Sequence, residues 1–143
     1  YSILKQAIGG DIIYDFEKSI SFEGDSGPYL QYSYARAKSV LEKAKGEGIK
    51  VSVGKIMPEI VELEKLLYRF PEIVERAGRE YSPHYITSYL IELAGSFNNF
   101  YAKHKIVDKE DETSPYKVAL TTAFAATIKN GLNLLGIQVP ERM

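Results

Sequence analysis

The chain has 143 residues, a net charge of −1 and a hydrophobic fraction of 45%. These values are typical of one globular domain that buries a core of its own. The absence of cysteine excludes disulfides, thiolate zinc sites and a cysteine nucleophile. The near-neutral charge also excludes nucleic-acid binding through phosphates alone, because that mode needs a clearly basic surface.

Residues 1–24 show no strong pattern of secondary structure. Within them, residues 11–16 alternate weakly between apolar and polar types, which fits either a short strand or a connector. The first residue is Tyr1, so we expect the chain to be part of a longer protein. No apolar run approaches the ~20 residues that cross a bilayer, and we expect no membrane contact.

A clear helix start follows this lead-in. Asp25 or Ser26 can cap the first free amides, and Pro28 suits the first turn, where its missing N–H leaves no bond unmade. The helix is predicted to continue to about Lys45. Glycines then indicate a loop over residues 46–54.

Proline and serine also divide the rest of the chain. Two short helices are predicted over residues 59–68 and 72–79, because Pro71 should end one and restart the other. Longer helices are predicted over about residues 82–104 and 114–135, each opened by a Ser-Pro pair. Antiparallel helices joined by short loops indicate an all-α bundle.

The predicted helix from Pro28 carries two stripes when its residues are placed at ~100° intervals. The stripe assigned to the core consists of Leu30, Tyr34, Ala37, Leu41 and Ala44. About a quarter-turn away, a second stripe holds Tyr29, Tyr32 and Arg36. Two neighbouring tyrosine rings can hold two unstacked bases, each stack contributing about 1–3 kcal/mol, and the arginine can take a phosphate. The alternative is that both tyrosines serve packing.

Positive charge is concentrated in one segment of the chain. Between residues 36 and 55 the basic side chains are Arg36, Lys38, Lys43, Lys45, Lys50 and Lys55. They are opposed only by Glu42 and Glu47, which leaves four positive charges in excess (6 − 2). This segment is either a solvated helix face or a local patch for a polyanion.

No sequence pattern indicates an active site. His84 and His104 lie near opposite ends of one predicted helix, too far apart to share a metal ion by local spacing. The simpler interpretation of His104 is a helix C-terminal residue, which the helix dipole favours. The motifs H-E-x-x-H, G-x-G-x-x-G and G-K-[ST] are absent. We therefore predict no catalytic, metal or cofactor site in this chain.

Three separated motifs carry a family resemblance. Residues 22–36, FEGDSGPYLQYSYAR, closely resemble the stretch that opens the C-terminal domain of arginyl-tRNA synthetases. Residues 97–101, FNNFY, match a later helix of that domain. Residues 129–137, KNGLNLLGI, and 140–143, PERM, look like that family's C-terminus. The resemblance covers essentially the whole chain in order.

The resemblance implies an all-α, antiparallel helix bundle of the DALR anticodon-binding type over residues 25–143. Residues 1–24 would be the junction to a missing catalytic domain. The parent would be a class I synthetase that joins L-arginine to its tRNA using ATP, which would bind in that catalytic domain. The HIGH-type and KMSK-type motifs of the family are absent here, so no active site and no cofactor are expected in this chain. The implied setting is a cytoplasmic fragment, monomeric, whose partners are the tRNA anticodon loop and the catalytic domain.

The resemblance implies RNA contacts only where residues match the family pattern. These are Tyr29, Tyr32, Arg36, Tyr101 and Met143. Some relatives carry a further aromatic residue where this chain has Lys105, so a phosphate contact is expected there. Tyr34 also departs from the pattern, but it lies on the core stripe and should serve packing.

Two alternatives remain open on the sequence alone. The same helices could form a protein-interaction module with tyrosines as interface anchors. The chain could also be the anticodon-binding domain of a sister class I synthetase that shares the fold.

Overall fold

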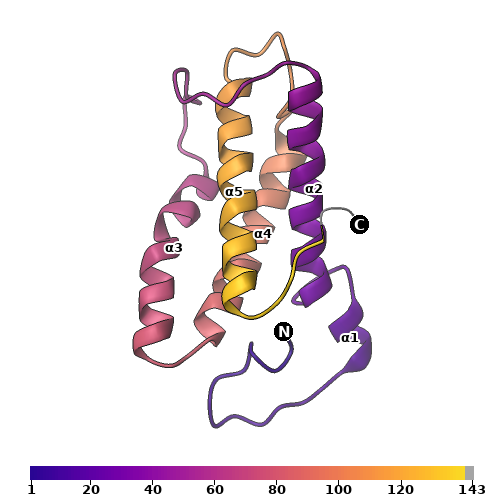
Figure 1. Cartoon of the computed structure of the whole chain (residues 1–143), viewed down its shortest axis with the longest axis vertical. Helices are drawn as coiled ribbons and strands as arrows, with labels where there is room; N and C mark the ends of the chain where they lie inside the picture. Colours follow the sequence, from indigo (N-terminus) through magenta and orange to yellow (C-terminus); the bar gives the residue numbers. More distant parts are fainter. Residues whose placement is uncertain (141–143) are drawn as a thin grey trace.

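The computed structural model describes residues 1–140 (Figure 1). Its helices are α1 (Phe16–Ile20), α2 (Gly27–Gly46), α3 (Glu62–Arg79), α4 (His84–Lys103) and α5 (Ser114–Leu134). No β-strand occurs within residues 1–140, which confirms the all-α prediction. Of the two interpretations of the lead-in, the connector is correct and the strand is wrong.

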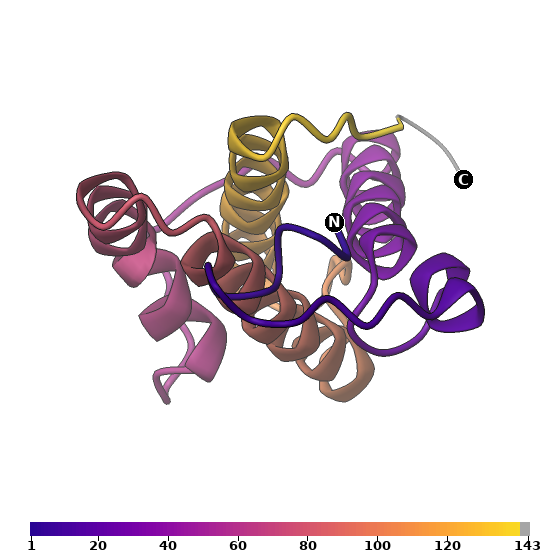
Figure 2. The ribbon, with the colours of Figure 1, turned by 90° about the horizontal axis from the view of Figure 1, so that it is seen from below.

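The long helices form an antiparallel bundle (Figure 1). Helices α2, α4 and α5 contact one another, and α3 packs mainly against α4 at the outer side. Seen from below in Figure 2, the residues before α2 cross one end of the bundle and bring α1 beside the start of α2. None of the helices within residues 1–140 combines the length and apolar character that a membrane crossing requires.

Helix α2 begins as its sequence predicts. The Ser26 hydroxyl accepts a hydrogen bond from the amide of Tyr29 at 3.1 Å, and Pro28 lies in the first turn. The two Ser-Pro pairs further on act differently, because neither of their serines caps a helix. The hydroxyl of Ser82 donates to the carbonyl of Glu80, and that of Ser114 donates to the carbonyl of Ile106.

Helix α3 is continuous, so the prediction of two short helices divided at Pro71 is wrong. Proline removes the N–H that would bond to the carbonyl of the residue four positions earlier. Packing against α4 outweighs that loss, since Leu66 is buried and its carbonyl accepts a hydrogen bond of 2.9 Å from the Tyr89 hydroxyl. The ring of Tyr89 also stacks on Phe70, with ring centroids 5.6 Å apart.

The core confirms most of the apolar stripe predicted on α2. On α2, four of the assigned residues are buried, namely Leu30, Tyr34, Ala37 and Ala44, whereas Leu41 is partly buried. On α4 the buried side chains include Ile86, Tyr89, Leu90, Leu93, Phe97 and Phe100. Phe97 stacks on Phe124 of α5, with ring centroids 4.0 Å apart. This ring stack joins α4 directly to α5 within the core.

One close approach between α4 and α5 depends on a glycine. A Cβ atom at Gly131 would lie 2.6 Å from Cδ2 of Leu90, whose side chain is fully buried. Real Cβ atoms essentially never come so near to another heavy atom. A side chain at this position would therefore force the two helices apart or displace Leu90.

Candidate nucleic-acid interface

The second stripe of α2 divides into an exposed part and a partly buried part. Tyr32 keeps 38% of its surface accessible, and Arg36 is partly exposed. Tyr29, in contrast, packs against the core, and its hydroxyl accepts a hydrogen bond from Asn98 of α4 at 2.9 Å. Tyr32 is therefore exposed, whereas Tyr29 is only partly covered by the core, and the RNA contacts of both tyrosines stay predictions.

Arg36 is held between two aromatic rings. Its guanidinium carbon lies 4.7 Å from the ring centroid of Tyr32 and 5.2 Å from that of Tyr101 on α4. These distances are within the range of cation–π attraction. Tyr101 is 44% exposed. The aromatic pair that flanks the arginine is thus Tyr32 with Tyr101, one residue from each of two helices.

Hydrogen bonds fix the orientation of the guanidinium. Its Nη1 donates to Oδ1 of Asn98 at 2.8 Å, and its Nη2 donates to the Tyr32 hydroxyl at 2.9 Å. The amide nitrogen of Asn98 also donates to the hydroxyls of Tyr29 and Ser33. Sequence reasoning missed Asn98, although its position three residues before Tyr101 places both on one face of α4.

A hollow of about 390 Å³ opens beside this cluster. Its lining consists of Tyr32, Ala35, Arg36, Ser39, Val40, Lys43 and Tyr101. Both charged residues of the lining are cations, and its two aromatic side chains are partly exposed. Flat π-faces beside fixed positive charge suit an unstacked base with its phosphate. We call this surface the α2–α4 hollow.

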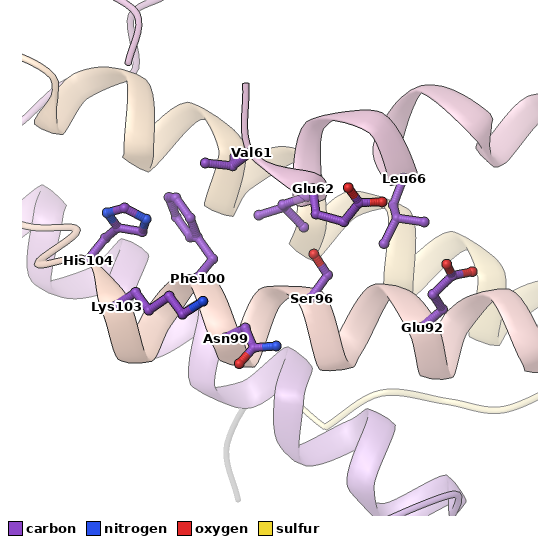
Figure 3. A pocket seen from close by; sticks show the side chains of 10 residues that line it. Val61, Glu62, Leu66, Glu92, Ser96, Asn99, Phe100, Lys103 and His104 are labelled. Atoms are coloured by element: carbon purple, nitrogen blue, oxygen red, sulfur yellow. The ribbon is translucent and has the colours of Figure 1, made fainter. Parts of the chain in front are cut away.

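A second hollow, of about 410 Å³, lies between α3 and α4 (Figure 3). Glu62 and Glu92 contribute carboxylates to it, and Lys103 and His104 contribute nitrogen groups toward its other end. Carboxylates repel phosphate, so this mixed lining suits a polyanion less well than the α2–α4 hollow does. The α2–α4 hollow is therefore the better candidate for nucleic acid.

Two other predicted contacts lie apart from the α2–α4 hollow. Lys105 follows the end of α4, is exposed, and forms an ion pair of 3.0 Å with Asp108. It is not part of the lining of the hollow. Met143 lies outside the described residues. The structure thus brings together Tyr32, Arg36 and Tyr101, with Tyr29 joined to them through Asn98.

Acidic residues balance part of the basic segment. Lys43 lies 3.9 Å from a carboxylate oxygen of Glu47, and Lys55 forms an ion pair with Glu112 from the loop before α5. All of these side chains are partly or largely exposed, so the pairs contribute little stability and can rearrange. Arg36 and Lys43 are the basic residues of this segment that line the α2–α4 hollow.

The histidines lie where they were predicted, at opposite ends of one helix. His84 begins α4, and His104 directly follows its last residue. Burial, followed by the charges of Lys117 and Lys103, lowers the pKa of His104. Within residues 1–140, no three side chains among His, Asp and Glu come close enough together to hold a metal ion.

A family model described as the DALR anticodon binding domain matches residues 30–143. The chain belongs to the DALR anticodon-binding domain family. The matched range contains the three clustered residues Tyr32, Arg36 and Tyr101, together with Asn98. The boundary at residue 25, which the sequence indicated as the start of the domain, stays a prediction.

Two curated relatives match this chain over only part of their own length. The arginine–tRNA ligase of Thermococcus kodakarensis is 39% identical over 152 residues, which cover all of this chain and 24% of that protein. The arginine–tRNA ligase of Clostridium botulinum is also 39% identical, over 145 residues that cover all of this chain and 26% of that protein. The chain thus spans about a quarter of the length of these relatives.

A solved structure supports the same assignment. The arginyl-tRNA synthetase of Thermus thermophilus matches with a TM-score of 0.83 and 31% sequence identity, over 99% of this chain and 25% of that one. The predicted bundle of the DALR type and the resemblance to arginyl-tRNA synthetases are both confirmed.

Proposed function

We propose that this DALR domain binds the anticodon loop of tRNA as the non-catalytic part of an arginine–tRNA ligase. The observation that carries the proposal is the α2–α4 hollow, where two partly exposed tyrosines flank a fixed arginine. Sequence-specific RNA recognition commonly uses unpaired loop bases stacked on aromatic rings or on guanidinium planes. Membership of the family and the ligase relatives support the same partner.

The reaction of the whole protein follows as part of this proposal. The enzyme joins L-arginine to tRNA using ATP, and both the reaction and the ATP site belong to a catalytic domain outside this chain. The protein works in the cytoplasm, where tRNA is charged, and this domain by itself is a monomer. The chain alone should show no arginine-dependent exchange of pyrophosphate into ATP, and activity in that assay would contradict this division of roles.

Residues 1–24 are proposed to join the domain to the catalytic domain. Much of their apolar surface is uncovered within residues 1–140, since Ile8 is 75%, Ile13 88% and Phe16 59% exposed. Exposed apolar side chains concentrated in one segment are typical of a surface that another part of a protein covers.

Binding to a defined RNA tests the proposed function. The probe is an RNA hairpin that carries the arginine anticodon UCU in its loop, and the comparison is the same stem with a different loop sequence. The unmodified chain should prefer the arginine hairpin, and raising the salt concentration should weaken binding. Equal affinity for both hairpins would overturn anticodon recognition, and preference for a hairpin with another amino acid's anticodon would indicate a sister synthetase.

Substitution of Tyr32 links the binding to the hollow. Tyr32→Ala removes one stacking face, which should reduce affinity for the arginine hairpin about tenfold. Tyr68 provides a matched control, because it is a tyrosine on α3 that is 88% exposed and lies outside the hollow. Equal losses in Tyr32→Ala and Tyr68→Ala would show that the α2–α4 hollow is not the binding site. Binding of a partner protein that is insensitive to salt and is weakened by Tyr32→Ala would instead favour a protein-interaction module.

A further inference from the structure

The hydrogen bonds around Asn98 have a defined direction. The guanidinium of Arg36 contains donors only, so the Asn98 atom 2.8 Å from Nη1 must be the amide oxygen. The other atom of the amide group is therefore the nitrogen. It donates to the Tyr29 hydroxyl at 2.9 Å and to the Ser33 hydroxyl at 3.2 Å. Ser33 accordingly sends its own proton elsewhere, to the carbonyl oxygen of Tyr29 at 2.9 Å.

The same reasoning fixes the roles of two tyrosine hydroxyls. The oxygen of Tyr29 accepts from Asn98, and the oxygen of Tyr32 accepts from Nη2 of Arg36 at 2.9 Å. Each hydroxyl therefore keeps its own O–H as a free donor. Within residues 1–140 no protein group accepts a hydrogen bond from either of them.

From this network, and resting on the proposed function, we infer that Asn98 is a positioning residue that makes Tyr29 a hydrogen-bond donor toward RNA. Tyr32, oriented by Arg36, presents a second donor beside it. The RNA groups that fit these positions are acceptors, such as a base carbonyl oxygen, a ring nitrogen or a phosphate oxygen. An exocyclic amino group is itself a donor and cannot accept a hydrogen bond from either hydroxyl. A base that places an amino group at one of these positions should therefore bind more weakly.

A double-mutant cycle tests the inference with the UCU hairpin as the probe. Tyr29→Phe removes the donor and keeps the ring, which should weaken hairpin binding about fivefold in the unmodified background. Asn98→Asp keeps an oxygen for Arg36 but replaces the amide nitrogen with an acceptor, so Tyr29 turns its proton toward the protein. In the Asn98→Asp background, Tyr29→Phe should therefore cause no further loss.

Tyr32 supplies the matched control for the cycle. Its hydroxyl bonds to Arg36, and Asn98→Asp keeps an oxygen that accepts from Arg36. Tyr32→Phe should therefore weaken binding by the same factor with or without Asn98→Asp. The added negative charge is present in both members of each comparison and cancels from the coupling. Thermal unfolding followed by circular dichroism confirms that each variant is folded.

The possible outcomes separate this inference from the proposed function. A loss from Tyr29→Phe that is equally large in the Asn98→Asp background would overturn it, and so would the absence of any loss in the unmodified background. Failure of the folded, unmodified chain to bind the hairpin would overturn the proposed function itself. The expected result is that, in the Asn98→Asp background, Tyr29→Phe no longer weakens hairpin binding whereas Tyr32→Phe still does.

Discussion

The rings of Phe22 and Tyr32 meet edge to face, with centroids 6.4 Å apart and planes inclined at 73°. Phe22 belongs to the lead-in before α2, whereas Tyr32 lines the α2–α4 hollow. The two rings are partly exposed, at 56% and 38%. The segment that sequence reasoning treated as a junction therefore touches the candidate site directly.

Removal of the Phe22 ring should loosen Tyr32. Edge-to-face aromatic pairs contribute about 0.5–1.5 kcal/mol beyond their buried area, so Phe22→Ala should weaken hairpin binding about threefold. Fluorescence anisotropy with the UCU hairpin measures the change. Ile13, in the same segment and 88% exposed, is the control, and Ile13→Ala should leave the affinity unchanged. Equal effects of the two substitutions would show that the ring contact does not organise Tyr32.

Two helix glycines should respond oppositely to alanine. Gly131→Ala places a methyl group against buried Leu90, and overpacking of this kind destabilises by about 1–3 kcal/mol. At Gly95 on α4 no other atom lies within 4 Å of the added Cβ, so Gly95→Ala should stabilise by up to about 1 kcal/mol. Urea unfolding measures both changes. Stabilisation by Gly131→Ala would mean that α4 and α5 can separate at little cost.

Acid should weaken the fold through the loop before α5. The ammonium of Lys117, together with Thr113, lowers the pKa of Asp111 to about 2, whereas an unfolded aspartate titrates near 3.9. The folded state therefore binds this proton more weakly, and the resulting stability is present above about pH 4 and is lost as the pH falls toward 2. Urea unfolding across this pH range should show the loss.

The neighbouring residue Glu112 provides the control for the acid experiment. Asp111 pairs with Lys117, which is 7% exposed, at 2.5 Å, whereas Glu112 pairs with Lys55 at the surface. Asp111→Asn should remove part of the pH dependence and lower stability at neutral pH, since it leaves a largely buried ammonium without its carboxylate. Glu112→Gln should change the free energy of unfolding by less than about 0.5 kcal/mol. Matching pH profiles for the two variants would contradict the assignment.

Local sequence signals predicted the helices where nearby residues decide the structure. Ser26 and Pro28 start α2 as expected, and the apolar spacing of α2 identified most of its buried face. Pro71 misled the prediction because the helix around it is held by α4, through contacts such as the bond from Tyr89 to Leu66. Such contacts join residues far apart in the sequence, so no local pattern contains them.

The sequence predicted which residue types form the candidate site, but it did not predict which of these side chains contact one another. Tyr32 and Arg36 were identified from one helix face, and Tyr101 from a family resemblance. The position of Tyr29 against the core and the bonds made by Asn98 depend on how α2 and α4 are placed against each other. Helix periodicity fixes the faces of each helix separately, but it does not fix this relative placement.

Among residues 1–140, the lining of the α2–α4 hollow comes from α2 and α4 alone. A surface built on two packed helices should change shape little on binding, so we expect little conformational entropy to be lost on association. The rate of complex formation should then depend on diffusion and orientation, without a slow rearrangement of the protein. Any adaptation of shape on binding would fall to the RNA loop, whose bases must leave their stack to reach the tyrosines.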